Sequence, residues 1–438
     1  MNAEPRTLHT RAEDELAAMF RSERGRLPGG AGIWREQAFA RFDRAGLPHR
    51  RVEAWKYTDL RALLRSVPPL SGEASRTQLG AFLRADRLHG VERARIVVVN
   101  GLFRPDLSDL SEVDGVEAES LADLIARDPH AVGRLFGDNA DAVLALNAAL
   151  LEGGVVVTVA RDANPALPIE IAHVAAVDQP AAIFQRDIVS IGENASARFI
   201  DTCFGPPEIA YQRNAATELD LAAGARIVWA RLQEEGDEAV HLASFGARLG
   251  RDAALDHVAV SSGAGLSRWQ GFIRIEGQGA RAGFFGATML SGGQHADLAL
   301  VVHHASEHTQ SRELFKNVAD GEAVGAFQGR IVVEAGAQKT DAKMMTQALI
   351  LSDSAQFAQK PELEIFADDV QCGHGATAGQ IDETMLFYLM ARGIPRAEAE
   401  QLLIEAFLAD AIDAVGEGAI AAAMRGVVAA WLAKRRPA

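Results

Sequence analysis

The chain has 438 residues, which is long enough for two or three domains or for one repetitive domain. Hydrophobic residues make up 48% of it and charged residues 24%, an ordinary globular composition that excludes a disordered chain. Acidic residues outnumber basic ones by 59 to 44, for a net charge of −15. This excess speaks against nucleic-acid binding, because phosphate contacts need clustered Lys and Arg.

The two cysteines, Cys203 and Cys372, do not form a disulfide framework, and alone they cannot supply a four-thiolate metal site. Residues 1–15 mix charges without an apolar core, so we expect no signal peptide. No window approaches the roughly 18 uncharged apolar residues that a membrane span requires. The sequence therefore predicts a soluble protein of a reducing compartment, the cytoplasm, with no contact to a membrane.

The N-terminal region has helical character. Apolar residues at helical spacing predict helices over residues 12–20, 33–42 and 60–64. Between the last two helices, Trp55 and Tyr57 lie two residues apart and so cannot share a helix face. We expect this stretch to be a surface segment that packs both aromatic rings on a core.

The next region mixes strands and helices. Residues 94–100 form an apolar, β-branched run that predicts a buried strand. Residues 118–152 return to helical spacing, and Gly153 with Gly154 ends that helical insertion. Residues 155–159 are β-branched and predict a second strand.

A repeat runs through residues 155–370. Strand-like bursts of four to seven residues alternate with Gly, Asn and Asp turns, and a small residue followed by Ala and a polar or charged residue recurs at a period near 28. The recurring positions are Arg198, Arg226, Ala254, Arg281, Gln310 and Gln338. A fixed period in this range indicates stacked supersecondary units, and two or three short strands per unit favour the coils of a parallel β-helix. We expect these positions to stack in successive coils.

The chain becomes helical again after Gly375. Apolar stripes predict helices over residues 381–390 and then to about 415, with a last helix over 419–432. The sequence thus predicts a mainly β protein with three parts. These are an N-terminal helical domain (1–92), a β-helix core (93–375, with the helical insertion at about 118–152) and a C-terminal helical domain (376–438).

Few residue patterns point to chemistry. No P-loop motif and no paired-carboxylate motif occurs in the sequence. Four histidines cluster at 295, 303, 304 and 308, and we expect them to be structural or exposed. In a strand His303 and His304 would point to opposite faces, whereas His304 and His308 could share an ion if the segment were helical. Cys372 and His374 stand two apart where the repeat ends, so in an extended segment both side chains could reach one ligand. The alternative is a small buried thiol beside a turn.

Several segments resemble one known family. They are 51–58 (RVEAWKYT), 315–321 (FKNVADG), 338–342 (QKTDA), 361–377 (PELEIFADDVQCGHGAT), 379–383 (GQIDE) and 386–394 (LFYLMARGI). Together they resemble the SufB/SufD family of iron–sulfur cluster assembly proteins over nearly the whole chain. The Cys-x-His-Gly-Ala-Thr form is similar to the SufD branch, although the family usually has Ser where Gly373 stands.

The resemblance implies a right-handed parallel β-helix between two helical domains. It also implies a non-catalytic scaffold subunit that pairs with SufB through the β-helix and binds the ATPase SufC through the C-terminal helical domain. His374 is then the main candidate ligand of iron or of a transient cluster shared with SufB, and Cys372 is a second candidate. This chain alone would hold no cofactor, and no residue is assigned to binding one.

Two other functions are compatible with a β-helix. One is a polysaccharide lyase or hydrolase, although the sequence lacks the clustered catalytic carboxylates or basic residues of that class. The other is a structural homo-oligomer, and a homodimer of the chain in isolation also stays open.

Overall fold

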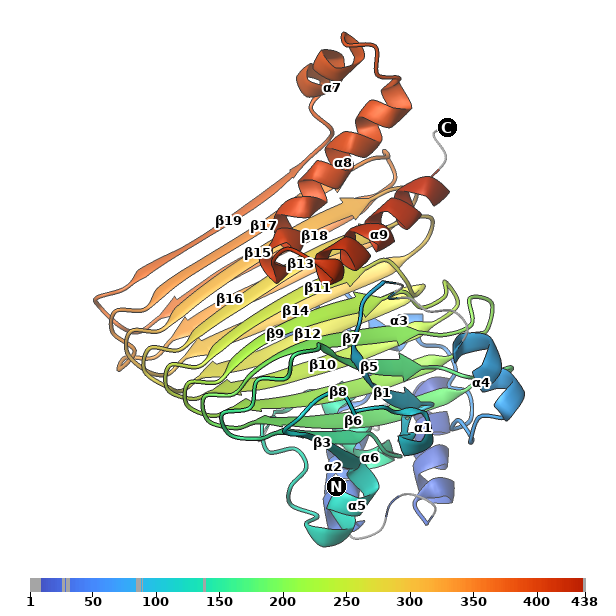
Figure 1. The fold of residues 1–438 in the computed structure, drawn as a ribbon. Coiled ribbons are helices and arrows are strands. Elements are labelled where there is room, and N and C mark those ends of the chain that lie inside the picture. The colour runs from blue at the N-terminus through green and yellow to red at the C-terminus, as the bar shows by residue number, and fades with distance from the viewer. Residues whose placement is uncertain are drawn as a thin grey trace, which may run out of the picture.

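The computed structural model describes residues 9–25, 28, 32–83, 88, 90–136 and 139–435. Its centre is a flattened solenoid of two facing sheets, and the chain alternates between them (Figure 1). Neighbouring strands from β4 onwards are parallel, so each coil adds one strand to each sheet. The predicted parallel β-helix is confirmed.

Sheet A has nine strands in the order β18-β16-β14-β12-β10-β8-β6-β4-β3. Their bounds are β3 (Val116–Ser120), β4 (Val155–Val159), β6 (Ala182–Ile191), β8 (Gln212–Leu221), β10 (Val240–Leu249), β12 (Leu266–Ile275), β14 (His295–His304), β16 (Val324–Val333) and β18 (Gln356–Ile365).

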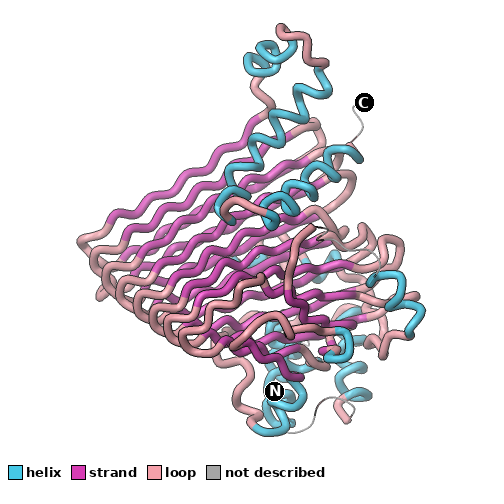
Figure 2. The backbone as a smooth tube through the Cα atoms, in the orientation of Figure 1, coloured by secondary structure: helices cyan, strands magenta, loops and turns pink. Residues whose placement is uncertain are grey.

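Sheet B has ten strands in the order β19-β17-β15-β13-β11-β9-β7-β5-β1-β2. Their bounds are β1 (Ala94–Val99), β2 (Leu102–Phe103), β5 (Ile169–Val174), β7 (Ser196–Phe204), β9 (Arg226–Gln233), β11 (Ala254–Ser261), β13 (Arg281–Leu290), β15 (Gln310–Ala319), β17 (Asp341–Ile350) and β19 (Gln371–Gly379). The turns that join sheet A to sheet B stack in a row along one side of the solenoid (Figure 2).

Helices lie before, within and after the strands. Their bounds are α1 (Arg11–Glu23), α2 (Gly32–Ala45), η1 (Glu53–Trp55), α3 (Leu60–Leu63), α4 (Arg76–Leu83), η2 (Pro105–Leu107), α5 (Leu121–Arg127), α6 (Ala142–Leu150), α7 (Glu383–Met390), α8 (Arg396–Ile412), η3 (Asp413–Val415) and α9 (Ala419–Lys434). None of those within the described ranges is long and apolar enough to cross a membrane.

Three expectations about the strands need correction. Each coil carries two strands, and most of them have eight to ten residues rather than four to seven. The expected helical insertion at 118–152 begins with a strand, because β3 pairs antiparallel with β4 before α5 and α6 follow. The expected boundary at residue 375 falls inside β19, which continues to Gly379.

The predicted 28-residue register holds in the middle of the solenoid and slips at its two ends. Arg226, Ala254, Arg281 and Gln310 are in register on successive strands. The predicted stacking position Arg198 lies two residues too late in the chain. Ser196, not Arg198, pairs with Arg226, and the buried corner residue of that coil is Ala195.

Gln338 is also wrong as a stacked position. The turn before β17 is longer than the earlier ones, so Gln338 lies within that turn and Asp341 pairs with Gln310. A longer turn shifts the strand register without changing the small residue that marks the repeat.

The inward faces of the two sheets form one core. Trp229 of β9 is 1% exposed, and its ring stacks on Phe199 at 5.0 Å and meets Phe245 edge-on at 5.6 Å between ring centroids. Its neighbour Val228 points outward and is half-buried. The alternation follows from the two-residue period of a strand.

Helices cover parts of both outer faces. Side chains of α1, α2 and α6 pack with Phe184, Leu242 and Leu266 on sheet A. Side chains of α8 and α9 pack with Val258 and Met289 on sheet B. Figure 1 shows α7 standing clear of the solenoid beyond β19.

The segment around Trp55 fastens the N-terminal helices to sheet A. The Arg268 guanidinium lies 3.9 Å from the Trp55 ring centroid, and the Trp55 Nε1 donates to Asp141 Oδ2 at 2.9 Å. The Ala54 carbonyl accepts from Arg268 Nη2 at 2.7 Å and from Gln328 Nε2 at 3.1 Å. The expected packing of an aromatic on a core is thus confirmed for Trp55, which is 1% exposed.

We expect Trp229→Ala to lower the free energy of unfolding by about 3–5 kcal/mol, because it removes a large side chain from the stacked core. Val228→Ala, one residue away on the outer face, should cost less than about 1 kcal/mol. Urea unfolding followed by far-UV circular dichroism measures both changes. Equal losses would contradict the inward and outward assignment of the two side chains.

A buried carboxylate makes a second prediction about the core. Glu313 of β15 is 2% exposed and lies in register between Phe284 and Met344, and burial raises the pKa of its carboxyl group from 4.5 to about 8. The folded state therefore holds this proton more tightly than the unfolded chain, so stability should fall as the pH rises from about 4.5 to 8. The expected loss is on the order of a few kcal/mol.

Glu313→Gln removes this titration. The variant should gain stability over the wild type at pH 8 but much less at pH 5, as measured by urea unfolding at both values. A stability difference that does not change with pH would show that Glu313 does not titrate in the core.

Candidate functional site

The candidate residues Cys372 and His374 lie on β19, the last strand of sheet B. β19 pairs with β17 on one side, in the registers Ala342–Cys372 and Met344–His374. β18 is the last strand of sheet A. Both sheets therefore end at the same place, at the C-terminal end of the solenoid.

The two side chains share the inward face of β19. Cys372 is half-buried and packs on the core, whereas His374 is exposed. Both continue inward rows of the solenoid, which pass through Ala282, Ser311 and Ala342 for Cys372 and through Phe284, Glu313 and Met344 for His374. The structure thus brings the two predicted residues together on one face of the open coil.

The electrostatic surroundings keep the Cys372 thiol protonated. Burial raises its pKa, the Asp341 and Glu313 carboxyl groups raise it further, and a backbone hydrogen bond at Ala342 opposes them. A thiol of this kind needs a metal or a partner's positive charge before it becomes a thiolate.

The described part of the chain contains no group of three or more His, Cys, Asp or Glu side chains placed to hold a metal ion. Cys372 and His374 therefore offer two ligand atoms at most, one sulfur and one imidazole nitrogen. These are ligand types that bind iron and iron–sulfur clusters. The arrangement suits a site completed by another chain at the open edge.

The other clustered histidines do not converge. His303 faces outward beside Glu334 at 3.3 Å, while His304 is buried and contacts Thr309 and Ser311 at 2.8 and 3.0 Å. Burial lowers the pKa of His304 to about 4, so its ring is neutral. The expectation that these histidines are structural or exposed fits this geometry.

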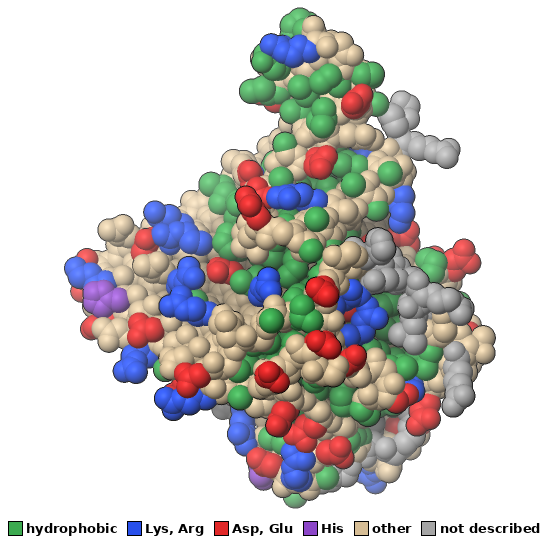
Figure 3. All heavy atoms as spheres, in the orientation of Figure 1, with side chains coloured by type: hydrophobic (Ala, Val, Ile, Leu, Met, Phe, Trp, Pro, Cys, Tyr) green, Lys and Arg blue, Asp and Glu red, His purple; other side chains and the backbone are tan. Residues whose placement is uncertain are grey.

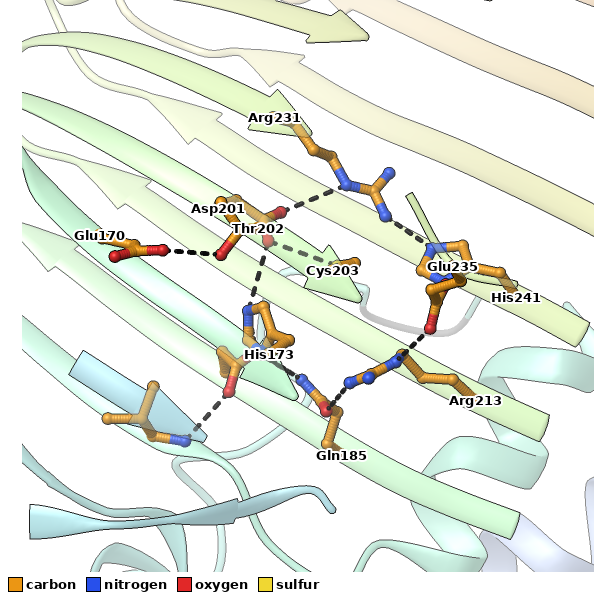
Figure 4. A network of polar contacts seen from close by, with 12 residues as sticks. Glu170, His173, Gln185, Asp201, Thr202, Cys203, Arg213, Arg231, Glu235 and His241 are labelled. Atoms are coloured by element: carbon orange, nitrogen blue, oxygen red, sulfur yellow. Dashed lines mark hydrogen bonds and ion pairs between the residues drawn. The ribbon is translucent and has the colours of Figure 1, made fainter. Parts of the chain in front are cut away.

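Sequence reasoning missed a buried polar network in the first coils, which Figure 4 shows. Arg231 Nε lies 3.3 Å from Asp201 Oδ2, and Arg231 Nη2 donates to His241 Nε2 at 2.6 Å. Arg213 Nε lies 3.0 Å from Glu235 Oε1, and His241 contacts the other oxygen of that carboxylate. The signal was present, since Asp201 and Arg231 stand two residues after the inward aromatics of successive coils.

This network is closed on itself. Because His241 Nε2 accepts a hydrogen bond, its proton sits on Nδ1 and faces Glu235, and burial lowers the pKa of the ring. Burial also raises the pKa of the Cys203 thiol far above its usual range, so this cysteine stays protonated. Such paired buried charges hold coils in one arrangement, and they offer no free nucleophile.

A second exposed feature is the apolar helix α7. Its side chains Met385, Phe387, Tyr388 and Met390 are 54%, 72%, 54% and 40% exposed. Leu386 points the other way and is 1% exposed. A helix that exposes four large apolar side chains in one short stretch indicates a contact with another protein.

Comparisons with known proteins agree with this geometry. Residues 173–407 match the description "SUF system FeS cluster assembly, SufBD core domain", and residues 31–171 match "SufBD protein N-terminal region". The iron–sulfur cluster assembly protein SufD of Escherichia coli is 30% identical over 377 residues, which is 85% of this chain and 86% of that protein. An iron–sulfur cluster assembly SufBD family protein of Synechocystis is 28% identical over 382 residues, 84% of each chain.

A third relative, SufD of Bacillus subtilis, is 25% identical over 273 residues, which is 61% of this chain and 62% of that protein. The family descriptions together span the solenoid, most of the helices before it, and α7 with most of α8 after it. The solenoid with its open C-terminal coil is thus a member of the SufBD family of iron–sulfur cluster assembly proteins.

Proposed function

We propose that the chain is a non-catalytic scaffold subunit of the SUF system that pairs with SufB and helps to form a nascent cluster or to admit iron between the two subunits. The observation that carries this proposal is the open coil, which presents Cys372 and His374 beside the free edges of both sheets. Membership in the family favours this scaffold role over the lyase or hydrolase alternative, which rested on the fold alone.

The free edges favour a partner with the same architecture. An unpaired edge strand exposes a row of backbone donors and acceptors, and proteins normally cover such edges or pair them. A second solenoid that adds strands to β18 and β19 would continue both sheets and shield the open core. SufB, as the other branch of the family, is the partner that we propose.

Pairing at this edge would complete a metal site. The neutral imidazole of His374 can ligate iron, and a SufB thiolate would supply ligands that this chain lacks. Cys372 lies beside it with a thiol whose pKa is raised, so it would ligate only when a metal or a nearby cation displaces its proton. We assign His374 the main role and Cys372 a secondary one.

The ATPase SufC is proposed to bind the C-terminal helices through α7. The exposed side chains of α7 are apolar and project from the body, whereas α8 and α9 are already engaged with sheet B. ATP hydrolysis would belong to SufC, in keeping with the scaffold role.

We expect His374→Ala to assemble with SufB and SufC as the wild type does, yet to reconstitute markedly less cluster. Because His374 is exposed, its loss should change the free energy of unfolding by less than about 0.5 kcal/mol. The measurement is visible absorbance and iron content after anaerobic reconstitution of the purified complex. Cys372→Ser serves as the neighbouring comparison and should have a smaller effect. Wild-type cluster content in the His374 variant would remove the ligand role.

We expect Phe387→Glu to weaken SufC binding by about tenfold or more, because it places a charge in the apolar face of α7. Isothermal titration of the full chain with SufC measures the effect. Ile33→Glu is the matched control, since Ile33 is also a large exposed apolar residue but lies on α2. A point change is preferable to deleting the C-terminal helices, which would uncover sheet B. Unchanged affinity in the Phe387 variant would place the SufC contact elsewhere.

A further inference from the structure

The outer face of sheet B carries a hollow of about 740 Å³ beside the open coil. The residues that line it belong to β13, β15, β17 and β19. Phe285, Leu314 and Met345 lie in register on neighbouring strands and form its apolar floor. Met345 is 39% exposed, and the other two are half-buried. The floor is thus a surface on which an apolar side chain can bury itself.

The last strand leaves its backbone bare on this side. The outward positions of β19 next to the floor are Gly373 and Gly375. A Cβ added at Gly373 would meet no atom within 4 Å, and one added at Gly375 would meet only the Met345 side chain. A partner can therefore approach the β19 backbone closely from outside at Gly373, whereas the Met345 side chain lies over Gly375.

Cations gather beside the floor. The two outward rows of sheet B next to it consist of Ser196, Arg226, Ala254, Arg281, Gln310, Asp341 and Gln371, and of Arg198, Val228, Asp256, Gly283, Arg312, Lys343 and Gly373. They contain five cations and two carboxylates, although the chain as a whole carries a net charge of −15. Three of the cations, Arg281, Arg312 and Lys343, and one of the carboxylates, Asp341, lie on the strands that line the hollow. Figure 3 shows Lys and Arg side chains on the left of the view, with Asp and Glu side chains among them.

The two carboxylates do not neutralise this excess. Asp341 Oδ2 lies 2.6 Å from Arg312 Nη2, and Asp341 Oδ1 lies 4.0 Å from Lys343 Nζ. A single carboxylate therefore forms ion pairs with two cations. Burial raises the pKa of Asp256, and the nearby positive charge of Arg281 opposes this shift. The Lys343 side chain remains 61% exposed and the Arg312 side chain 41% exposed.

We propose that this hollow is the docking surface for an acidic partner protein, which places an apolar side chain over Phe285, Leu314 and Met345 and carboxylates against Arg312 and Lys343. The charge of the partner follows from complementarity, since a local basic face on an acidic chain steers acidic surfaces to this one place. The apolar floor then supplies the buried centre that a specific contact needs.

A protein fits this surface better than a nucleic-acid strand. Single strands bind by stacking successive bases on aromatic side chains. The floor offers one aromatic ring, Phe285, and its other members are aliphatic or thioether side chains. The bare glycine backbone of β19 suits a protein side chain or loop that packs against it.

The surface lies on the flat face of sheet B, so it stays accessible if a second solenoid pairs with the strand edges. Cys372 and His374 are also among the residues that line the hollow, so a protein docked here would lie against the strand that carries them. Docking contacts the flat face and pairing contacts the strand edge, so docking does not require SufB at the edge.

The test uses the full chain and fluorescein-labelled peptides in fluorescence anisotropy. The first peptide has a Leu-Phe pair flanked by glutamates, and the second has the same charge with serines in place of the pair. We expect the first peptide to bind more tightly and its binding to weaken as salt is added. Lys343→Glu and Met345→Glu should each weaken it by roughly tenfold.

Arg134→Glu is the matched control, because Arg134 is 63% exposed, lies outside sheet B and gives the same change of net charge as Lys343→Glu. It should leave the affinity unchanged. Equal loss in this control, equal affinity for the serine peptide, or no binding of the first peptide would each overturn the proposal. Tighter binding of an oligothymidylate than of the peptide would overturn it in favour of nucleic acid.

Discussion

A coil of this chain cannot bury its own inward side chains, because it contributes only one strand to each sheet. Trp229 is buried because the coils before and after it supply Phe199 and Phe245. Because each coil depends on its neighbours, the first and last coils lack a neighbour on one side and must be covered in another way. At the N-terminal end, β2 pairs antiparallel with β1 and β3 pairs antiparallel with β4. At the C-terminal end, β18 and β19 are the last strands of their sheets, and each has a partner strand on one side only. The interior of the stack is thus self-sufficient, and its last coil is not.

The uneven ends explain where chemistry can occur. Within the stack, polar side chains that face inward must find partners inside the protein, as Arg231 does with Asp201 and His241. At the last coil the same inward rows reach solvent, so Cys372 and His374 keep unused ligand atoms. The proposed scaffold role depends on such a place, because its cluster site would be completed only on assembly with the partner.

The outer faces show a similar division. The helices α8 and α9 cover the part of sheet B near the strand ends and leave the part near the strand starts bare. The bare part holds the basic rows and the apolar hollow next to β19. The end edge, the flat face and α7 are therefore three separate surfaces at the C-terminal end of the solenoid.

The sequence by itself determined the repeat, the strand content and the motif around Cys372 and His374, because side chains at a fixed period record which positions face a shared core. It misplaced Arg198 and Gln338, because a small residue shows where a corner lies but not how many residues the turn contains. Only the tertiary structure decided which coil stays open and that Asp201 meets Arg231. It also decided that Arg312, Lys343 and Met345 surround one hollow. Those contacts join residues about one coil apart, and the stacking register that brings them together depends on every turn between them.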